Sequence, residues 1–374
     1  MVDIITKTVK PSGGDYTSIS AAITGEVTAR AGLVARDETL VIECYKGDYD
    51  AAGGVNYINE SANINGFTTN ATHYVRITTP ATERHNGKVF DGDGNYTGFC
   101  VKNTGSRAFL FNDPYTEVDG IICARGTNYC SGMIVSYNAG NYCNIHHNIL
   151  FDYGGVNYAY TGITLGDYCY GYIWNNIFIK SQCRIGNTSN ATRWWYVYNN
   201  TFYGCHFNGN NDGITRAKNN LVFYDGAACF VGTFHADSDY NMSANTDGDD
   251  ATAPGTNALT NKALTDCDFV SVDYDNDQDF HIETTSDANG AGENLYADGN
   301  LAVETDIDGD ARPSSGFFCI GADEIVAVVS GTNMQINISD VWKTVASAQI
   351  NINDTWKDVD SIQQNIGDSW KTVF

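Results

Sequence analysis

Asparagines recur at regular intervals through the middle of the chain, each followed by a short apolar run, and this pattern constrains the fold most. The segments are CNIHHNILFD from residue 143, YIWNNIFIKS from 172, VYNNTFYGC from 197 and RAKNNLVFYD from 216. They align on Asn148, Asn176, Asn200 and Asn220, at intervals of 28, 24 and 20 residues, and Asn241 follows 21 residues later. Asparagine tolerates the left-handed turn conformation, and coils of this length can stack on one another. The pattern therefore predicts a parallel β-helix.

An antiparallel β-sandwich is the alternative fold for a chain with such strands and turns. It favours tight Asn-Gly or Asp-Gly loops between strands in which apolar and polar residues alternate. Here the Asn-Asn pairs precede runs such as IFI from 177 and LVF from 221, which are apolar at successive positions. Such runs fit strands that are buried on one face and partly covered on the other, which favours the β-helix.

The first 34 residues have the pattern of a cap on the open end of such a fold. Residues 15–33 predict an amphipathic helix with Asp15 placed to cap its N-terminus. Its apolar face contains Ile19, Ala22, Ile23 and Val27. A buried strand, TLVIECYKGDYD, follows from residue 39. We expect the helix to cover the first coil, which would otherwise present an unpaired strand edge.

The last 46 residues, 329–374, contain three copies of a 14-residue unit. Trp342, Trp356 and Trp370 recur at this spacing, and each is followed by a lysine: Lys343, Lys357 and Lys371. Alternation in QINI and VWKT predicts that each unit is a short β-hairpin. A helical interpretation, with 14 as two heptads, is disfavoured by β-branched residues, Asn and Gly367. We expect a separate module for assembly or attachment, with residues 35–328 forming the β-helix body.

Composition and charge exclude several classes of function. The 374 residues include 38 Gly, 23 Tyr and only 5 Pro, as in a turn-rich β protein, and the formal net charge is -24. Nucleic acids and anionic membranes bind to Lys/Arg-rich faces, so neither is an expected partner. The N-terminus has no apolar stretch as long as that of a signal peptide, and no window contains the roughly 18 apolar residues of a membrane span. We expect a soluble product of the cytoplasm. Its 11 Cys, without a CxxC pair, are expected to be reduced and buried.

Two stretches carry a resemblance to a known superfamily. GGDYTSISAAI with ETLVIECYKGDYD lies near the start of the chain, and DIDGDARPSSGFFCIGADE spans 306–324. With the Asn coils between them, they resemble right-handed parallel β-helix proteins of the pectate-lyase-like superfamily, above all the non-catalytic ones common in tailed phages and in some bacterial surface proteins. In the second stretch Arg312 and the IGADE turn match the segment that closes the β-helix. The resemblance implies an all-β fold: a right-handed parallel β-helix with a helical N-terminal cap and a small C-terminal hairpin module.

The resemblance also implies a function. Short W-K repeats similar to those at residues 335–374 end some phage structural proteins. We therefore expect a virion structural protein, either a tail fibre, a tail spike or a capsid-decorating fibre, which leaves the host cytoplasm by lysis. Its expected partners are other virion proteins, further copies of the chain, most simply as a homotrimer, and a host-surface glycan.

Two alternatives remain open, an enzyme and a bacterial surface adhesin. A polysaccharide lyase or glycoside hydrolase would place acidic groups on one exposed sheet. Asp152, Asp167, Asp212 and Asp225 lie at the ends of coils, but the sequence marks no pair among them. We therefore expect no catalytic residues. The adhesin is disfavoured because no secretion signal is apparent.

An aromatic segment is the candidate contact surface for a glycan or a protein partner. In RWWYVY, Trp194 and Trp195 are adjacent and must point to opposite faces of a strand, so one fills the core and the other faces outward. Beside Arg193, Tyr196 and Tyr198, the outward ring can stack on a sugar.

Charged and imidazole side chains give weaker candidates for a metal site. Asp306, Asp308 and Asp310 alternate in TDIDGDAR and can bind calcium, although the distal Glu of an EF-hand is missing. A solvated turn is the simpler interpretation, as it is for DYDNDQD at 273–279. No other cofactor is expected. His146 and His147 are predicted to be stacked and hydrogen-bonded within a coil, rather than to bind a metal.

Overall fold

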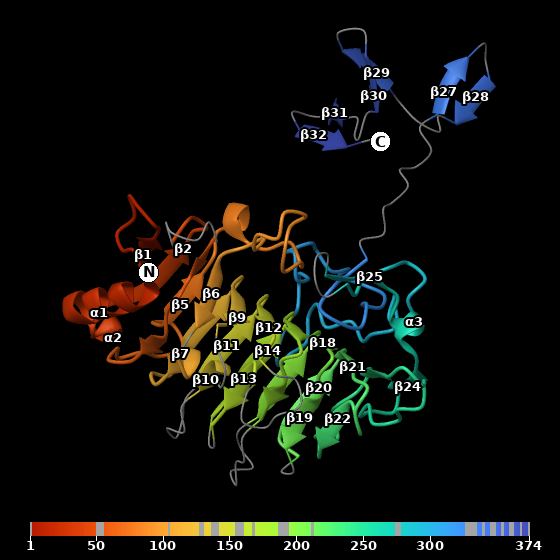
Figure 1. Ribbon diagram of the computed structural model, residues 1–374. Coiled ribbons are helices and arrows are strands. Elements are labelled where there is room, and N and C mark those ends of the chain that lie inside the picture. Colours follow the sequence, from red (N-terminus) through yellow and green to blue (C-terminus); the bar gives the residue numbers. More distant parts are fainter. Residues whose placement is uncertain are drawn as a thin grey trace. The chain divides into compact units, whose positions relative to one another are not determined.

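The computed structural model describes residues 2–49, 56–103, 105–126, 131–135, 142–153, 161–166, 169–185, 194–210, 213–273 and 278–325, together with six strands nearer the C-terminus (Figure 1). The chain divides into two compact units, the body, Met1–Ile325, and the C-terminal unit, Val326–Phe374. No helix in the described part is long and apolar enough to cross a membrane.

Three sheets of parallel strands make up most of the body. Sheet A contains, in spatial order, β1 (Asp3–Val9), β2 (Glu38–Cys44), β5 (Val75–Thr78), β8 (Thr116–Asp119), β11 (Tyr142–His146), β14 (Tyr170–Trp174), β17 (Trp195–Tyr198) and β20 (Thr215–Lys218). Sheet B contains β4 (Ala62–Ile64), β7 (Arg107–Phe111), β10 (Ser131–Val135), β13 (Ile163–Leu165), β16 (Cys183–Arg184), β19 (Phe207–Asn210) and β22 (Phe230–Gly232). Sheet C contains β3 (Tyr57–Ile58), β6 (Cys100–Asn103), β9 (Ile122–Arg125), β12 (Ile149–Phe151), β15 (Ile177–Ile179), β18 (Thr201–Tyr203), β21 (Leu221–Phe223), β23 (Met242–Ala244) and β24 (Leu259–Lys262).

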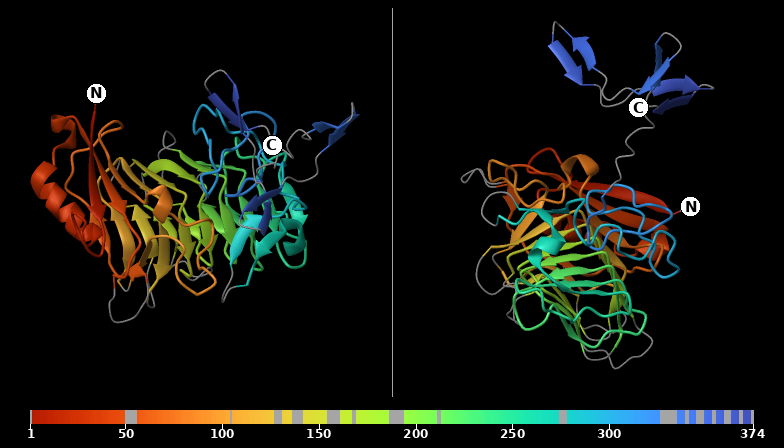
Figure 2. Two further views of the ribbon diagram at one scale, coloured as in Figure 1. Left: turned by 90° about the horizontal axis from the view of Figure 1, so that it is seen from above. Right: turned by 90° about the vertical axis from the view of Figure 1, so that its right-hand side faces the viewer.

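The chain visits the three sheets in turn, so that each coil contributes one strand to each sheet. β8, β9 and β10, for example, pair in parallel with β11, β12 and β13 of the next coil. Figures 1 and 2 show successive coils side by side along the body, from α1 at one end to β24 at the other. This arrangement confirms the predicted parallel β-helix and is not the antiparallel sandwich.

The aligned asparagines form a buried ladder between sheets A and C. The Nδ2 of Asn176 donates to Oδ1 of Asn200 at 3.0 Å, and the Nδ2 of Asn200 donates to Oδ1 of Asn220 at 3.0 Å. Asn148 and Asn241 extend the same series at its two ends. Each amide also donates to a backbone carbonyl of the preceding coil, as Asn200 does to Ile173 at 3.0 Å. The ladder therefore provides hydrogen-bond partners for the buried polar groups at the corner where the backbone passes from sheet A to sheet C.

The left-handed residue of each turn is the one before the ladder asparagine, which corrects the sequence prediction. Positive φ angles occur at His147 (53°), Asn175 (50°), Asn199 (51°), Asn219 (55°) and Tyr240 (54°). The ladder asparagines are absent from this set. In each Asn-Asn pair the first residue thus makes the turn and the second one stacks inside.

Apolar side chains fill the interior and also cover the outer face of sheet C. Inside, Phe178 and Phe202 stack with ring centroids 4.4 Å apart. Outside, Ile177 and Ile179 pack against Phe280 in a second cluster. Both faces of β15 are therefore buried, which explains its three successive apolar residues. Ten of the eleven cysteines are described, and all ten are buried, as expected.

The N-terminal cap consists of β1 and two helices, α1 (Ile19–Arg30) and α2 (Leu33–Arg36). Ser18, rather than Asp15, caps α1, because its side chain accepts the N–H of Ala21 at 3.1 Å. Asp15 instead accepts the N–H of Thr8 at 2.8 Å. The sequence did not predict β1, which pairs in parallel with β2 and extends sheet A by one strand.

The chain leaves the last coil through α3 (Leu264–Cys267) and an antiparallel pair, β25 (Phe269–Ser271) and β26 (Asp279–Ile282). A short 3-10 helix, η1 (Ala81–Glu83), lies in an earlier loop. Residues 286–325, which we call the closing segment, then return along the left-handed residues of the coils. Gly321 N–H donates to the carbonyl of Asn219 at 2.8 Å, and the side chain of Asn175 donates to the carbonyl of Thr305 at 2.6 Å.

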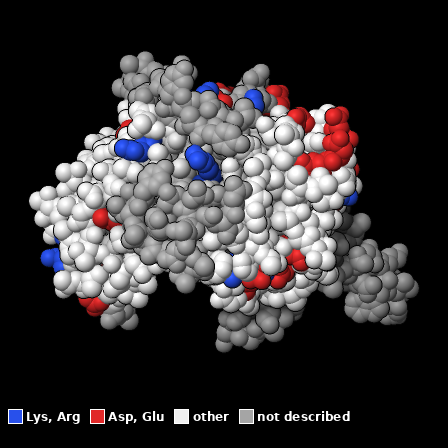
Figure 3. Space-filling model, turned by 90° about the horizontal axis from the view of Figure 1, so that it is seen from below, with Lys and Arg blue, Asp and Glu red and all other residues white. Residues whose placement is uncertain are grey.

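Charged side chains are unevenly distributed on the body. On the face shown in Figure 3, Asp and Glu gather toward the end farther from α1, whereas Lys and Arg are isolated. The described residues of this face form no broad basic patch, in keeping with the net charge of -24.

The C-terminal unit contains three separate antiparallel hairpins. Their strands are β27 (Gln335–Ile338) with β28 (Val341–Thr344), β29 (Gln349–Ile352) with β30 (Thr355–Asp358), and β31 (Gln363–Ile366) with β32 (Ser369–Thr372). In all three the tryptophan is the register partner of an asparagine, as Trp342 is of Asn337. The hairpin prediction is confirmed, and the helical interpretation is wrong.

Candidate functional site

Two rows of polar and aromatic side chains run across the outer face of sheet A. Register partners on successive strands form the first row: Arg76, Glu117, Asn144, Tyr172, Tyr196 and Arg216. The second row, two residues further along each strand, is Thr78, Asp119, His146, Trp174, Tyr198 and Lys218. The residues between the rows, such as Val118 and Ile145, belong to the interior core. Since neighbouring residues of a strand face opposite sides, both rows face outward.

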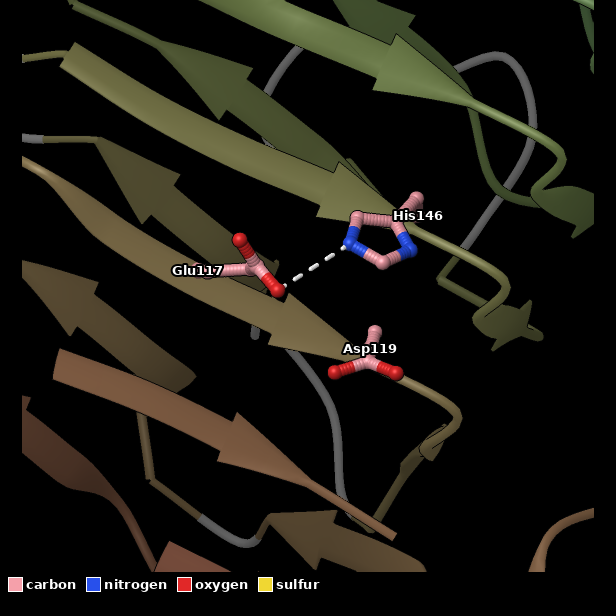
Figure 4. Close-up of side chains that lie close together, drawn as sticks. All are labelled: Glu117, Asp119 and His146. Carbon is pink, nitrogen blue, oxygen red and sulfur yellow. Dashed lines mark ion pairs between the residues drawn. The ribbon is translucent and has the colours of Figure 1, made fainter. Parts of the chain in front are cut away.

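Glu117, Asp119 and His146 come together where the two rows cross β8 and β11 (Figure 4). Glu117 Oε1 lies 3.5 Å from His146 Nε2 and 2.9 Å from Arg76 Nε. Asp119 is fully buried and accepts two hydrogen bonds from Arg76, at 2.9 and 3.1 Å, while Arg84 pairs with its Oδ2. Two arginines thus hold the acidic pair in place.

The surroundings keep both carboxylates ionised. Burial alone would raise the pKa of Glu117, but its contact with His146 and the charge of Arg76 lower this pKa below the ordinary value. Burial is likewise outweighed at Asp119, where the hydrogen bonds from Arg76 and the charges of Arg76 and Arg84 lower the pKa far below its usual range. A glycoside hydrolase needs one carboxyl group with a raised pKa to protonate the leaving group. Neither carboxylate has this property, so the pair is better suited to binding.

The same geometry argues against a metal ion at this cluster. Its three ligand atoms lie within 4.8 Å of one another, which is close enough for an ion. However, Arg76 already contacts both carboxylates, and Arg84 contacts Asp119. A divalent cation would have to share these oxygens with two fixed positive charges, which repel it.

A directed chain of hydrogen bonds connects this cluster to the closing segment. Arg312 donates to Oδ1 of Asn175 at 3.2 Å, so the amide nitrogen of Asn175 faces Nε2 of His147 at 3.1 Å. His147 Nε2 is therefore an acceptor, and its Nδ1 donates to Nδ1 of His146 at 2.7 Å. His146 then presents its Nε2 hydrogen to Glu117. Burial keeps His147 neutral by lowering its pKa well below the usual value.

His146 is also held by stacking, as the sequence predicted. Its ring lies 3.9 Å from that of Trp174, with an angle of 20° between the planes. His85 supports the same turn, because its Nε2 lies 2.7 Å from the carbonyl oxygen of His147 and its Nδ1 accepts the N–H of Gly87 at 3.3 Å. Burial lowers the pKa of His85 to about 4, so the ring stays neutral.

Tyrosines continue from the cluster across the strands as an aromatic track. Tyr142 lies 5.1 Å from Tyr115 and 5.8 Å from Tyr172, and Tyr172 lies 5.1 Å from Tyr196, measured between ring centroids. A pocket of about 210 Å³ opens beside Glu117, lined by Tyr74, Tyr115, Thr116, Glu117, Tyr142 and Asn144. Drug-sized pockets occupy roughly 300–1,000 Å³. The pocket therefore suits one unit of a larger molecule.

The structure places the predicted aromatic contacts on both sides of the sheet. Trp195 lies in the core, and Tyr198 is covered by Leu295 and Phe318, so neither reaches the surface. Residues near 295–318 thus cover part of the outer face. Trp194 and Tyr196 are half-buried and hold Arg216, whose guanidinium lies 4.2 Å from the Trp194 ring. The prediction that one tryptophan faces inward and the other outward is confirmed. Arg193 lies outside the described residues.

The predicted calcium residues are not gathered around one point. Asp306 is buried and uses Oδ1 to accept the backbone N–H groups of Asp308 and Asp310, at 3.0 and 2.9 Å. It acts as a turn-forming residue, and burial raises its pKa to about 7. Asp308 instead faces His281, and Asp310 is exposed. Asp279, at the end of the supposedly solvated 273–279 segment, is buried and pairs with Lys88.

The remaining predicted residues lie apart from the cluster. Asp152 pairs with Arg125, and Asp225 accepts the N–H of Thr246. Asp167 and Asp212 lie outside the described residues. Trp342, Trp356 and Trp370 lie on β28, β30 and β32, each followed there by its lysine, Lys343, Lys357 or Lys371. The assembly role of these six residues stays a prediction.

Sequence reasoning missed Glu117 and Asp119. The signal was the alternation in TEVDG, which puts both carboxylates on one face of a strand. The pair His146 and His147 follows one coil later, so stacking of the coils brings it beside them. No family model, curated protein or solved structure matches the chain.

Proposed function

We propose that the body binds a polysaccharide along the outer face of sheet A. The observation that supports this most is the aromatic track that leads from the pocket beside Glu117 to Tyr196. Tyrosine rings present flat apolar surfaces on which the faces of sugar rings stack, and their hydroxyls form hydrogen bonds. Adjacent strands of a sheet lie about 4.8 Å apart, so the track offers repeated contacts to a repeating ligand.

The charged groups of the site complement a ligand rich in hydroxyls. Glu117 and Asn144 line the pocket and offer acceptor and donor atoms. Because Arg76 and His146 hold the Glu117 carboxylate, it is already oriented before a ligand arrives. A preoriented site loses less entropy on binding.

We further propose that the chain is a structural protein of a tailed-phage virion, present as a tail fibre, a tail spike or a capsid-decorating fibre. This assignment rests on the sequence resemblance. In it, the body attaches the particle to a cell-surface glycan, and the C-terminal hairpins join the chain to further copies or to another virion protein. A homotrimer is the simplest arrangement of such copies.

Replacing Tyr142 with alanine tests the glycan site. We expect binding of the full chain to a bacterial polysaccharide to weaken about tenfold, because one stacking contact of roughly 1.4 kcal/mol is lost. The measurement is binding to an array of purified O-antigen and capsular polysaccharides, followed by titration of the best ligand. Phe317→Ala is the matched control, since Phe317 is 64% exposed and lies outside the track.

The same array decides between binding and catalysis. If the parent chain binds none of the polysaccharides, or if Tyr142→Ala binds as tightly as the parent, the glycan site is wrong. Release of reducing or unsaturated sugar ends that stops in Glu117→Gln would instead make the protein a polysaccharide-degrading enzyme.

Removing residues 333–374 tests the assembly role of the C-terminal unit. We expect a folded body that no longer associates, because two-stranded hairpins are marginally stable alone and gain stability by packing. Burial of three tryptophans can contribute on the order of 10 kcal/mol per chain. Light scattering should report a monomer for the truncated chain and an oligomer for the full chain, with unchanged β-sheet circular dichroism.

Point variants sharpen this test. Trp356→Ala should weaken association, whereas Trp356→Phe, which keeps an aromatic ring, should largely preserve it. An oligomer of unchanged mass after truncation would show that the body itself carries the interface.

A further inference from the structure

A second group of side chains, separate from the sheet A site, gathers where β26 meets the closing segment. His281 lies on β26, while Asp308 and Asp323 belong to the closing segment. One ligand atom from each of the three lies within 4.8 Å of the others, and His281 Nε2 is 2.7 Å from Asp308 Oδ2. We call these three residues the His281 group.

The ring of His281 is oriented by a contact at its other nitrogen, Nδ1. Its Nδ1 contacts the carboxylate of Asp279, and the other oxygen of that carboxylate lies 2.7 Å from Lys88 Nζ. A histidine that binds a metal nearly always donates its second ring nitrogen to a carboxylate or carbonyl in this way. The arrangement makes Nδ1 a donor to Asp279, while Nε2 donates to Asp308 in the absence of an ion and would give up this hydrogen to a bound metal.

A carboxylate oxygen of this group is buried without a partner. Asp308 Oδ1 has almost no exposed surface and forms no hydrogen bond. The backbone of Gly87 comes close to this point: a Cβ at this residue would lie 2.5 Å from His281 Cε1 and 3.1 Å from Asp308 Oδ1. Buried polar atoms are almost always paired in folded proteins. An unpaired carboxylate oxygen therefore indicates that a partner is missing. Because the backbone of Gly87 comes so close, that partner must be small.

The charges around the group point to a cation. Two ion pairs border it, Lys88 with Asp279 at 2.7 Å and Arg312 with Glu324 at 2.6 Å. Each of these bordering carboxylates already has its own cationic partner. Within the described residues, Asp308 forms an ion pair with His281 alone and Asp323 forms none; the charge of Arg312 also acts on Asp323, but without a direct contact. Carboxylates taken out of water need a compensating charge or metal.

We propose that His281, Asp308 and Asp323 bind one divalent transition-metal ion, with Zn²⁺ as the ion that suits them best. One imidazole nitrogen and two carboxylate oxygens form a three-ligand set that zinc accepts, with a fourth position for water. Calcium takes oxygen ligands only, so this site differs in ligands and in metal from a calcium loop at Asp306, Asp308 and Asp310. The ion joins β26 to the closing segment and thereby holds the segment on the outer face of sheet C.

Metal titration of the full chain tests the proposal. After dialysis against a chelator, calorimetry with ZnCl₂ should give one strong site per chain, and bound Co²⁺ should show the visible absorption of a low-coordinate complex. Zn²⁺ should raise the thermal midpoint, and Ca²⁺ should not compete. Asp308→Asn and His281→Gln should each weaken Zn²⁺ binding at least tenfold.

A matched control comes from the same turn. Asp310 is exposed and outside the group, so Asp310→Asn should bind Zn²⁺ as the parent does. Absence of a stoichiometric site in the parent overturns the proposal, whatever the variants do. So does equal binding by the parent and by folded His281→Gln, since the ion would then occupy another site. The glycan array is independent of this result, so the two proposals can fail separately.

Discussion

Replacement of Arg312 with methionine is expected to lower the free energy of unfolding by about 4 kcal/mol, the largest effect of any single substitution considered. The Arg312 guanidinium is fully buried and contacts Glu324 at 2.6 Å. It also donates to the carbonyls of Gly321 and Ala322, at 3.1 and 2.9 Å. Methionine fills a similar volume but leaves a buried carboxylate without a counterion, and such breaks cost roughly 3–5 kcal/mol.

Urea unfolding followed by circular dichroism gives the size of this loss. The double variant Arg312→Met with Glu324→Gln should be more stable than the sum of the single effects predicts, because it removes the unpaired charge. Arg36→Met is the matched control, since the Arg36 side chain is 49% exposed and its ion pair should contribute less than about 1 kcal/mol. A loss below 1 kcal/mol in Arg312→Met would mean that Glu324 is solvated and the closing segment is loosely held.

The same variant should also affect the sheet A site at a distance. Arg312 and the carbonyl of Thr305 together set the orientation of the Asn175 amide, which determines the direction of the hydrogen bonds through His147 and His146 to Glu117. Without Arg312 the amide keeps only one of these two contacts, its bond to the Thr305 carbonyl, so the hydrogen bonds that end at Glu117 are held less firmly. We therefore expect weaker polysaccharide binding in the folded fraction, although Arg312 contacts no ligand in the proposed site.

Replacement of Asn200 with alanine is expected to lower the free energy of unfolding by about 3 kcal/mol. The side chain of Asn200 donates to Ile173 and Asn220, and its Oδ1 accepts both the backbone and side-chain N–H groups of Asn176. Alanine removes these bonds and leaves several buried partners unpaired, each of which costs roughly 1–3 kcal/mol. This loss exceeds that of a single hydrogen bond because the asparagine lies within a ladder.

Unfolding in urea also tests the ladder, with hydrogen exchange to locate the damage. Protection should fall in the coils on either side of residue 200 and remain near α1. Asn86→Ala is the matched control, because Asn86 is exposed and its loss should change stability by less than about 0.5 kcal/mol. Equal stability of Asn200→Ala and Asn86→Ala would contradict a structural role for the ladder.

The coil architecture could be predicted from sequence because its signal is local and repeated. Each Asn-Asn pair stands directly before its strand, so spacing alone reveals the coils. The sequence does not show which residue of a pair makes the turn and which joins the ladder. Both residues of Asn199-Asn200 tolerate a left-handed turn, and only the packing of the core decides which one stacks inside. The strand β1 was missed because DIITKTV alternates weakly and is stabilised by its pairing with β2.

The candidate site was less predictable because its contacts join distant residues. Arg312 and Asn175 are 137 residues apart, and no periodicity connects them. Trp195 and Tyr198 appear equivalent to Trp194 and Tyr196 in the sequence. Their burial depends on the interior core and on residues near Leu295, which return to the sheet after the coils are complete. Long-range packing of this kind leaves no local pattern.

The path of the closing segment has a consequence for how such a chain can change length in evolution. The segment meets Asn219 through Glu293, reaches back to His147 through Thr305, and returns to Asn219 through Gly321. A new coil inserted between His147 and Asn219 would lengthen this span by about 4.8 Å. Each arm of the segment would then need one or two further residues, at about 3.3 Å per extended residue. Coil number and segment length must therefore change together, so the length of the closing segment limits how many coils it can span.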